Sequence, residues 1–335
     1  MIAFLVRRTL LAGLTTFAIS IVGFVVIQLP PGDYITLYVQ TLTDSAGEGS
    51  AAEMVDPALE AQLRRDYGLD QPLVVQYAKW AWRMLRFDWG ISFMYQQRIT
   101  DVIIGDRLVN TVLLAMGTVL FTWVLAIPIG IYSAVRHNTL GDYAVTFVGF
   151  LGLAVPDFLL ALALMWVAFA YFGISAGGLY SPEYLTAPWS LGRVVDLLKH
   201  LWIPAIVLGT SGTAALIRIL RNNLLDELGK LYVIAARAKG LAESRLVFKY
   251  PVRIALNPLV STVGYLLPFL FSGSVIVSVV LSLPTLGPVL LTALLQEDLF
   301  LAATIMVLLG MLTVVGTLIS DVLLVVVDPR IRAGG

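Results

Sequence analysis

Long apolar runs separated by shorter polar segments dominate this chain. The apolar runs cover residues 9–29, 111–135, 145–172, 201–220, 256–281 and 301–327. A bilayer core about 30 Å thick is crossed by about 20 apolar residues of helix, so each run is long enough to span it. The pattern predicts an all-α integral membrane protein with six transmembrane helices. Pro204, Pro258 and Pro268 lie inside the fourth and fifth runs and favour kinked helices packed in a bundle.

Composition supports the membrane assignment and removes several classes of function. Of 335 residues, 59% are hydrophobic and 13% are charged, and the mean hydropathy is +0.87. Soluble domains carry about 45–50% apolar and about 25% charged residues, so an ordinary soluble domain is excluded. The chain has no cysteine and only two distant histidines, His137 and His200, so we expect no disulfide and no metal site. Its net charge is zero, so it lacks the excess of basic residues that is typical of nucleic-acid-binding domains.

The distribution of basic residues predicts the orientation in the membrane. Segment 30–108 carries seven basic and eleven acidic residues, whereas segment 218–253 carries eight basic and three acidic residues. Loops on the cytoplasmic side are enriched in Lys and Arg, which places both termini in the cytoplasm. The first run is long enough to span the membrane and no small-residue cleavage pattern closes it, so we expect a retained anchor. The other basic residues on the predicted cytoplasmic side are Arg7, Arg8, Arg136, Arg330 and Arg332.

The outer segment, residues 30–108, is too long to be a simple connection. Asp56 followed by Pro57 is typical of a helix start, and Gly68 is typical of a helix end. A second short helix is expected from Pro72, where aromatic residues such as Trp80 favour the membrane interface. Two interpretations stay open for this segment: a folded outer cap without ligand contact, or a part that receives substrate.

The inner segment contains a short amphipathic helix. An apolar face of Leu231, Val233, Ile234 and Ala238 is accompanied by the charged residues Arg237 and Lys239. Gly240 then supplies a natural helix stop. A short helix of this kind, held between two membrane spans, suits insertion into a groove on a partner protein.

These residues carry a family resemblance. The stretch "YVIAARAKGLAESRLVFKYPVRIALNPLV" resembles the cytoplasmic coupling loop of permeases of bacterial binding-protein-dependent ABC importers, in the form found in dipeptide and oligopeptide permeases. The segments "YGLDQPLVVQYAKWAWRMLRFDWGIS", "SLPTLG" and "DPRIR" resemble further blocks of the same group in the same order. The resemblance implies a type I ABC importer permease fold with an outer helical insertion after the first span. It divides the chain into an N-terminal span (1–29), the insertion (30–108), a transmembrane core (109–327) with its coupling loop (221–253), and a cytoplasmic tail (328–335).

The resemblance also assigns residues to the contact with an ATPase. The E-A-A-x-x-x-G core of the family loop corresponds to Ile234, Ala235, Ala236 and Gly240, so the glutamate is missing and no salt bridge from that position is expected. Small alanines permit close approach to the partner, and glycine permits a positive φ. The expected ATPase-coupling residues are Leu231, Tyr232, Ala235, Ala236, Arg237, Lys239 and Gly240.

Polar residues within or near the spans are candidates for the substrate path. Ionisable groups in a membrane are costly, so Asp157 is expected to face a watery path or to bond to a neighbouring helix. Asn110, Ser211 and Thr213 are further path candidates, and Asp321 and Asp328 are expected to pair with arginines.

An outer gate is expected near the end of the fifth span. Ser278, Pro284 and Gly287 are its candidates, with a re-entrant turn of purely structural role as the alternative. Ser278 and Thr285 replace a glutamate and a glycine that are common in the family, so a polar gate on the family pattern is not carried over.

The chain contains no G-x-x-x-x-G-K-[ST] phosphate loop, so ATP and Mg²⁺ are expected in separate subunits and no enzymatic activity is expected here. The resemblance implies a second homologous permease, two ABC ATPase subunits or domains and an extracytoplasmic solute-binding protein, besides membrane lipid. The predicted function is translocation of peptides across the bacterial cytoplasmic membrane by alternating access.

Oligosaccharides, opines or nickel chelates are the alternative substrates. A secondary transporter is a more distant alternative, because the two halves show no convincing duplication. An intramembrane enzyme lacks support, because the chain has neither an H-E-x-x-H nor a G-x-S-x-G element.

Overall fold

A computed structural model describes residues 2–29, 35–36, 61–62, 64–65, 68–173 and 177–327 of the chain. These residues are almost entirely helical, and the one β-type pairing among them joins Ile91 and Arg98. The main helices in chain order are α1 (Ile2–Ile27), α5 (Leu73–Leu85), α6 (Ile99–Ile104), α7 (Asp106–Val135), α8 (Leu140–Ala154), α9 (Asp157–Phe172), α10 (Leu191–Leu228), α11 (Leu231–Ala238), α12 (Glu243–Lys249), α13 (Pro251–Ala255), α14 (Asn257–Val280), α15 (Leu286–Leu295) and α16 (Leu299–Val327).

Several of these helices are long and apolar enough to cross a bilayer. Four pass the test among the described residues, within α1, α6–α7, α10 and α16, and a fifth is counted if α8 and α9 form one broken span. The predicted fifth span coincides with α14, a helix of 24 residues, some of whose side chains lie outside the described part. The all-α membrane fold is confirmed, and the number of six spans stays a prediction.

The third predicted span is not one continuous helix. The chain breaks between α8 and α9 and bends by 103°. Val155 adopts an extended conformation (φ −83°, ψ 123°), as the residue before a proline prefers, and Pro156 is the N-cap of α9. The prediction of an unbroken helix over 145–172 is therefore wrong at the Val-Pro step, and α8 with α9 is a broken span or a re-entrant pair.

The chain forms two compact units, which we describe separately. The smaller unit consists of residues 10–109 and 285–311. In it, Trp80 of α5 is buried against Phe24 of α1, with ring centroids 5.4 Å apart, and against the start of α16. The opposite face of α5 exposes Val74, Trp82 and Leu85, which fits the predicted interfacial helix. Asp56 and Pro57 lie outside the described residues, and Gly68 has the positive φ (70°) of the predicted stop.

A buried carboxylate organises the start of α16 in the same unit. Asp298 accepts hydrogen bonds from the Ser92 hydroxyl at 2.6 Å, the Met94 amide at 3.1 Å and the Leu301 amide at 3.2 Å. Asp298 is thus the N-cap of α16 and also fastens the loop before α6. Burial raises the pKa of Asp298, since desolvation opposes its charge.

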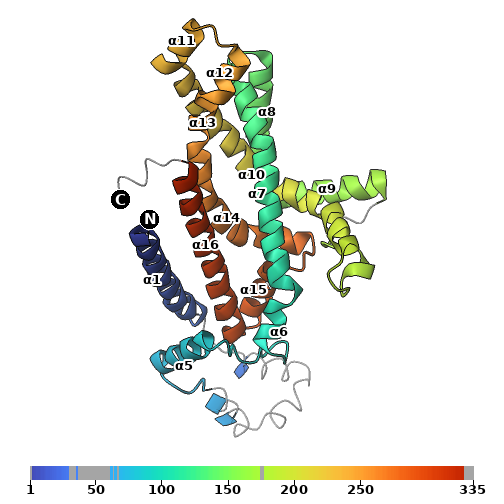
Figure 1. The fold of residues 1–335 in the computed structure, drawn as a ribbon. Helices are drawn as coiled ribbons and strands as arrows, with labels where there is room; N and C mark the ends of the chain where they lie inside the picture. Colours follow the sequence, from blue (N-terminus) through green and yellow to red (C-terminus); the bar gives the residue numbers. More distant parts are fainter. Residues whose placement is uncertain are drawn as a thin grey trace. The chain divides into compact units, whose positions relative to one another are not determined.

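The larger unit consists of residues 1–9, 110–284 and 312–335. Its central element is α10, a helix of 38 residues that contacts α8, α9, α11, α13 and α14. Close helix contacts require small residues here: a Cβ at Gly152 would lie 2.6 Å from Thr210 Cγ2, and a Cβ at Gly209 would lie 2.8 Å from Phe121 Cδ1. The α8–α10 and α7–α10 contacts are therefore tight. Figure 1 shows α11, α12 and α13 grouped beyond one end of α10.

Candidate functional site

The predicted coupling loop (221–253) begins in the last two turns of α10 and continues as three short helices. After α10 ends, Lys230 is extended (φ −72°, ψ 148°) and α11 begins at Leu231. The helix ends at Ala238, and Gly240 has a φ of +79°, the left-handed conformation expected of a glycine stop. α12 and α13 then lead the chain back into α14. The short helix and its glycine stop lie where the sequence predicted them.

One face of α11 is anchored in the larger unit. Val233 is completely buried, and Ala236, one turn further on, packs against the same cluster. The other buried members of this cluster come from α7, α10, α12, α13 and α14: Ala126, Ile131, Ala134, Leu216, Leu220, Leu224, Leu246, Val247, Val252, Ala255 and Leu259. A force on α11 is therefore transmitted to the packed side chains of α7, α10, α12, α13 and α14.

The opposite face of α11 is apolar and exposed. Leu231 is 84% exposed and Ile234 is 50% exposed, and Ala235 and Ala238 are exposed as well. These positions follow i, i+3, i+4 and i+7 spacing, so the four side chains form one stripe, which we call the α11 stripe. The expected apolar face is corrected in one respect: Val233 lies on the buried side, because it packs into the cluster beneath the helix.

Arg237 has a partner within the chain. Its Nε and Nη2 donate to the two carboxylate oxygens of Glu243 in α12, at 3.0 Å and 2.5 Å. This hydrogen-bonded ion pair lowers the pKa of the Glu243 carboxyl and raises the pKa of Arg237. Arg237 therefore braces the corner between α11 and α12, and its contact with an ATPase stays a prediction. Lys239 is exposed, and no described residue bonds to its amine.

Tyr232 is also bonded within the loop. Its hydroxyl donates to Glu227 near the end of α10, and together burial and this carboxylate raise the pKa of Tyr232. The two bonded residues fix both ends of α11, so the stripe is held in a defined direction.

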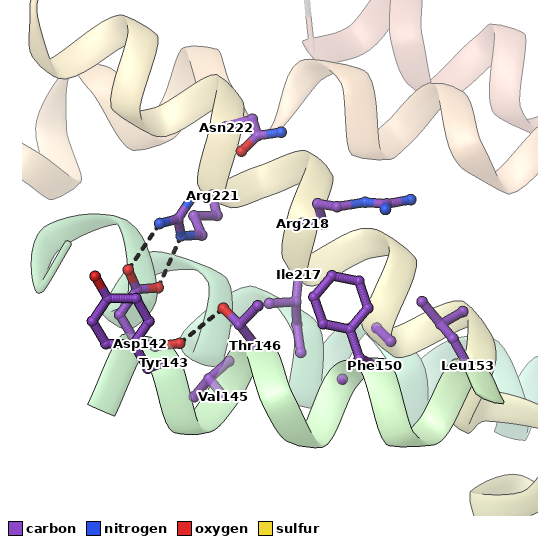
Figure 2. A pocket seen from close by; sticks show the side chains of 12 residues that line it. Asp142, Tyr143, Val145, Thr146, Phe150, Leu153, Ile217, Arg218, Arg221 and Asn222 are labelled. Carbon is purple, nitrogen blue, oxygen red and sulfur yellow. Dashed lines mark hydrogen bonds and ion pairs between the residues drawn. The ribbon is translucent and has the colours of Figure 1, made fainter. Parts of the chain in front are cut away.

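A buried ion pair that sequence reasoning missed fastens α8 to α10. Asp142 is 1% exposed and accepts two hydrogen bonds from Arg221, from Nε and Nη2, both at 2.8 Å. The Ser133 hydroxyl and the Asn138 backbone N–H also donate to this carboxylate. Figure 2 shows the paired charges bridging the two helices. The only signal in the sequence was an acid and a base near helix ends on the same predicted side of the membrane.

The path candidate Asn110 is hydrogen-bonded to other residues of the larger unit. It is fully buried, its Nδ2 donates to the Pro284 carbonyl at 3.1 Å, and its Oδ1 accepts from the Tyr180 hydroxyl at 2.9 Å. The structure thus joins one path candidate, Asn110, to one gate candidate, Pro284, across 174 positions of sequence. Tyr180, which links them to the segment between α9 and α10, carried no distinctive signal in the sequence.

The remaining path candidates lie on α9 and α10. Asp157 is the first residue of α9 and is half-buried after the chain break. Thr213 is buried and Ser211 half-buried on α10, and neither hydroxyl oxygen finds a hydrogen-bond partner among the described residues. Buried polar groups normally have partners, so these two hydroxyls are the stronger candidates for a wet interior surface. Their role in the path stays a prediction.

The gate candidates lie around the connection from α14 to α15. Ser278 is completely buried near the end of α14, and the Leu283 amide donates to its carbonyl at 2.7 Å. Ser282 has a positive φ of 52°, and Gly287 is buried in α15. At ten residues, α15 is too short to span a bilayer, which favours the re-entrant turn. A gating role stays a prediction.

Of the two acidic residues expected to pair with arginines, Asp321 lies among the described residues and Asp328 does not. Asp321 pairs with Arg8 at 3.0 Å, as expected of an acid near a membrane end. Asp328 and the "DPRIR" block lie outside the described residues. No group of His, Cys, Asp or Glu in the described ranges is arranged to hold a metal ion.

Comparison with known proteins identifies the family. The family described as "Binding-protein-dependent transport system inner membrane component" matches residues 126–333, and its N-terminal companion matches residues 1–115. The oligopeptide transport system permease protein AppB of Bacillus subtilis is 35% identical over 337 residues, covering 99% of this chain and 100% of its own length.

Two further relatives cover 99% of this chain and 99% of their own lengths. A putative peptide transport system permease protein of Brucella abortus is 31% identical, and the inner membrane ABC transporter permease protein YejB of Escherichia coli O157:H7 is 30% identical. Matches of this extent, together with the apolar helices, establish a multi-pass inner membrane protein. The chain belongs to the family of inner membrane components of binding-protein-dependent transport systems.

Proposed function

We propose that this chain is a translocation subunit of an ATP-driven importer for peptides. The three relatives above include two named as oligopeptide or peptide permeases, which supports the substrate class. The family description itself implies a binding protein, which we place on the extracytoplasmic side. A second homologous permease and two ABC ATPase subunits, which bind ATP and Mg²⁺, complete the proposed assembly.

The observation that carries the mechanism is the two-sided construction of α11. Val233 and Ala236 anchor it in the packed end of the larger unit, whereas the stripe of Leu231, Ile234, Ala235 and Ala238 is free to dock. An apolar helix face with small residues fits a hydrophobic groove on a partner. We place that groove on the ATPase, with both termini of this chain on the same cytoplasmic side, as the basic loops support.

Alternating access then follows from differential affinity. ATP binding closes the two ATPases, and the docked α11 helices move with them, so nucleotide favours one arrangement of the bundle. To move a population from 1:99 to 99:1, the nucleotide state must favour one arrangement by about 5.5 kcal/mol. Rigid anchoring through the Val233 cluster allows that free energy to reach α7, α10 and α14.

The docking of α11 on the ATPase is tested by placing a charge on the α11 stripe. Ala235→Asp puts a carboxylate at the docking surface, and we expect peptide uptake by the reconstituted importer to fall at least tenfold while the chain still assembles in the membrane. Ala242→Asp is the matched control: it is the same substitution in the same loop, at an exposed N-cap where aspartate is favourable.

Three readouts separate the outcomes. We expect Ala235→Asp to lose binding-protein-stimulated ATP hydrolysis together with uptake, and Ala242→Asp to keep both. Uptake at the wild-type level in Ala235→Asp would contradict the docking role of α11. Uptake of peptide by this chain without any ATPase subunit would instead support a secondary transporter.

A further inference from the structure

A groove runs between α8 and α10 in the larger unit (Figure 2). It has a volume of about 240 Å³, and its α8 lining extends from Asp142 to Leu153, about 16 Å of helix. Most of its lining is apolar, from Val145, Gly149, Phe150, Leu153, Ala214 and Ile217. Polar side chains gather toward the end of α10 that leads into α11.

The charges along this groove do not balance. Arg221 is paired with Asp142 through two hydrogen bonds. Arg218, one turn earlier on α10, is exposed, and no described residue forms an ion pair or hydrogen bond with its guanidinium. Figure 2 shows Arg218 projecting above Phe150 and away from the Asp142 carboxylate. The groove therefore presents one uncompensated cation beside an apolar channel.

The surface around the groove is suited to lipid. Tyr143, Phe147, Phe150 and Leu153 of α8 are all exposed, with Phe147 64% exposed. In a membrane-spanning chain such a face meets acyl chains or another protein, and a guanidinium near the end of a span reaches the level of the lipid headgroups. A guanidinium binds a phosphate with two parallel hydrogen bonds, and basic pockets at the ends of spans bind anionic headgroups.

We propose that the α8–α10 groove binds an anionic phospholipid of the leaflet on the α11 side. Arg218 holds the headgroup phosphate, and the exposed amide of Asn222, one turn away, is the second donor. One acyl chain lies along Phe150, Leu153 and Ile217. The charge of Arg218 selects an anionic lipid, and the apolar lining selects a lipid over a free phosphate ion. This site is separate from the α11 stripe and goes beyond the transport function.

The experiment measures bound lipid on the assembled importer. The complex is reconstituted in nanodiscs containing equal amounts of phosphatidylglycerol and phosphatidylethanolamine, extracted in mild detergent, and the retained lipid is determined by native mass spectrometry. We expect the wild type to retain phosphatidylglycerol selectively, and Arg218→Gln to retain about tenfold less, as the loss of one charge-assisted contact implies.

Two further variants separate charge from shape and from general effects. Gly149→Leu fills the groove without a change of charge, since a Cβ at Gly149 makes only an ordinary 3.6 Å contact with Ala214, and it should lose the lipid as well. Arg253→Gln removes an exposed arginine of the same loop region away from the groove, and it should keep the lipid. All variants are compared at equal recovery of assembled complex.

A photoreactive residue at Phe150 identifies the occupant directly. We expect an adduct with phospholipid. An adduct with the second permease chain would overturn the proposal and mark the groove as a subunit interface. Equal retention of phosphatidylglycerol by the wild type and Arg218→Gln, or no preference over phosphatidylethanolamine in the wild type, would also overturn it.

Discussion

The Asp142–Arg221 pair gives the most quantitative prediction. Asp142 is 1% exposed and is bonded to Arg221, Ser133 and Asn138, so Asp142→Asn leaves a largely buried guanidinium facing an amide instead of a carboxylate. Breaking a buried ion pair by removing one partner costs about 3–5 kcal/mol. We expect this loss in the free energy of unfolding of the purified chain, measured by SDS titration in mixed micelles.

A double-mutant cycle isolates the pair. Arg221→Gln removes the cation, and the double variant replaces the ion pair by two amides that can bond to each other. The amide oxygen introduced at position 142 keeps the Asn138 N–H donor, and the Ser133 hydroxyl, which donated to the other carboxylate oxygen, can turn to accept from the new NH2 group. We therefore expect the losses from the two single variants to exceed the loss from the double variant by about 2–3 kcal/mol. The control cycle uses the exposed pair Arg83–Asp88, whose coupling should stay below about 1 kcal/mol. Additivity within about 0.5 kcal/mol at Asp142 and Arg221 would refute the reasoning.

Three other variants probe the loop and the capped helix. Gly240→Val forces a β-branched residue to a φ of +79° and should destabilise the chain by about 1–2 kcal/mol in the same titration, whereas Gly240→Asn should cost less. Asp298→Ala leaves the buried Ser92 hydroxyl and two backbone amides without their acceptor, and a loss of about 2–4 kcal/mol is expected; a change below about 0.5 kcal/mol would contradict the capping role. The lowered pKa of Glu243 means that its pair with Arg237 stabilises the α11–α12 corner above the ordinary glutamate pKa and is lost as the pH falls through the lowered value. Hydrogen exchange of α11, corrected for intrinsic rates, should therefore accelerate on acidification in the wild type and be fast at every pH in Glu243→Gln. If exchange in that variant were slow and still depended on pH, the Arg237–Glu243 pair would be excluded as the cause of the pH dependence.

The sequence predicted the short helix of the inner loop because its signals are local. The apolar run from Leu231 and the glycine at position 240 mark the extent of α11 without help from the rest of the chain. The direction of the helix was not predictable. Six of its eight residues are aliphatic, so periodicity alone could not decide that Val233 faces inward and Ala235 outward.

The sequence contains a signal for the break between α8 and α9, but the prediction gave more weight to hydropathy. A run of apolar residues from 145 to 172 satisfies the length criterion for a span, whereas the Val-Pro step at 155–156 determines the local backbone. Contacts such as Asn110 with Pro284 and Asp142 with Arg221 join residues 174 and 79 positions apart. No periodicity connects such positions, so they follow only from the packed structure.

Chemical cross-linking tests the proposed coupling most directly, because the chain contains no cysteine and a single one can be introduced. In the assembled importer, a cysteine in place of exposed Ala235 should cross-link to the ATPase subunit, and one in place of buried Val233 should not. We expect the Ala235 cross-link to abolish nucleotide-dependent uptake and to be reversed by reduction. A cysteine at position 235 that reacts only from outside the cell, or that forms no product with the ATPase, would contradict the role of α11 in coupling.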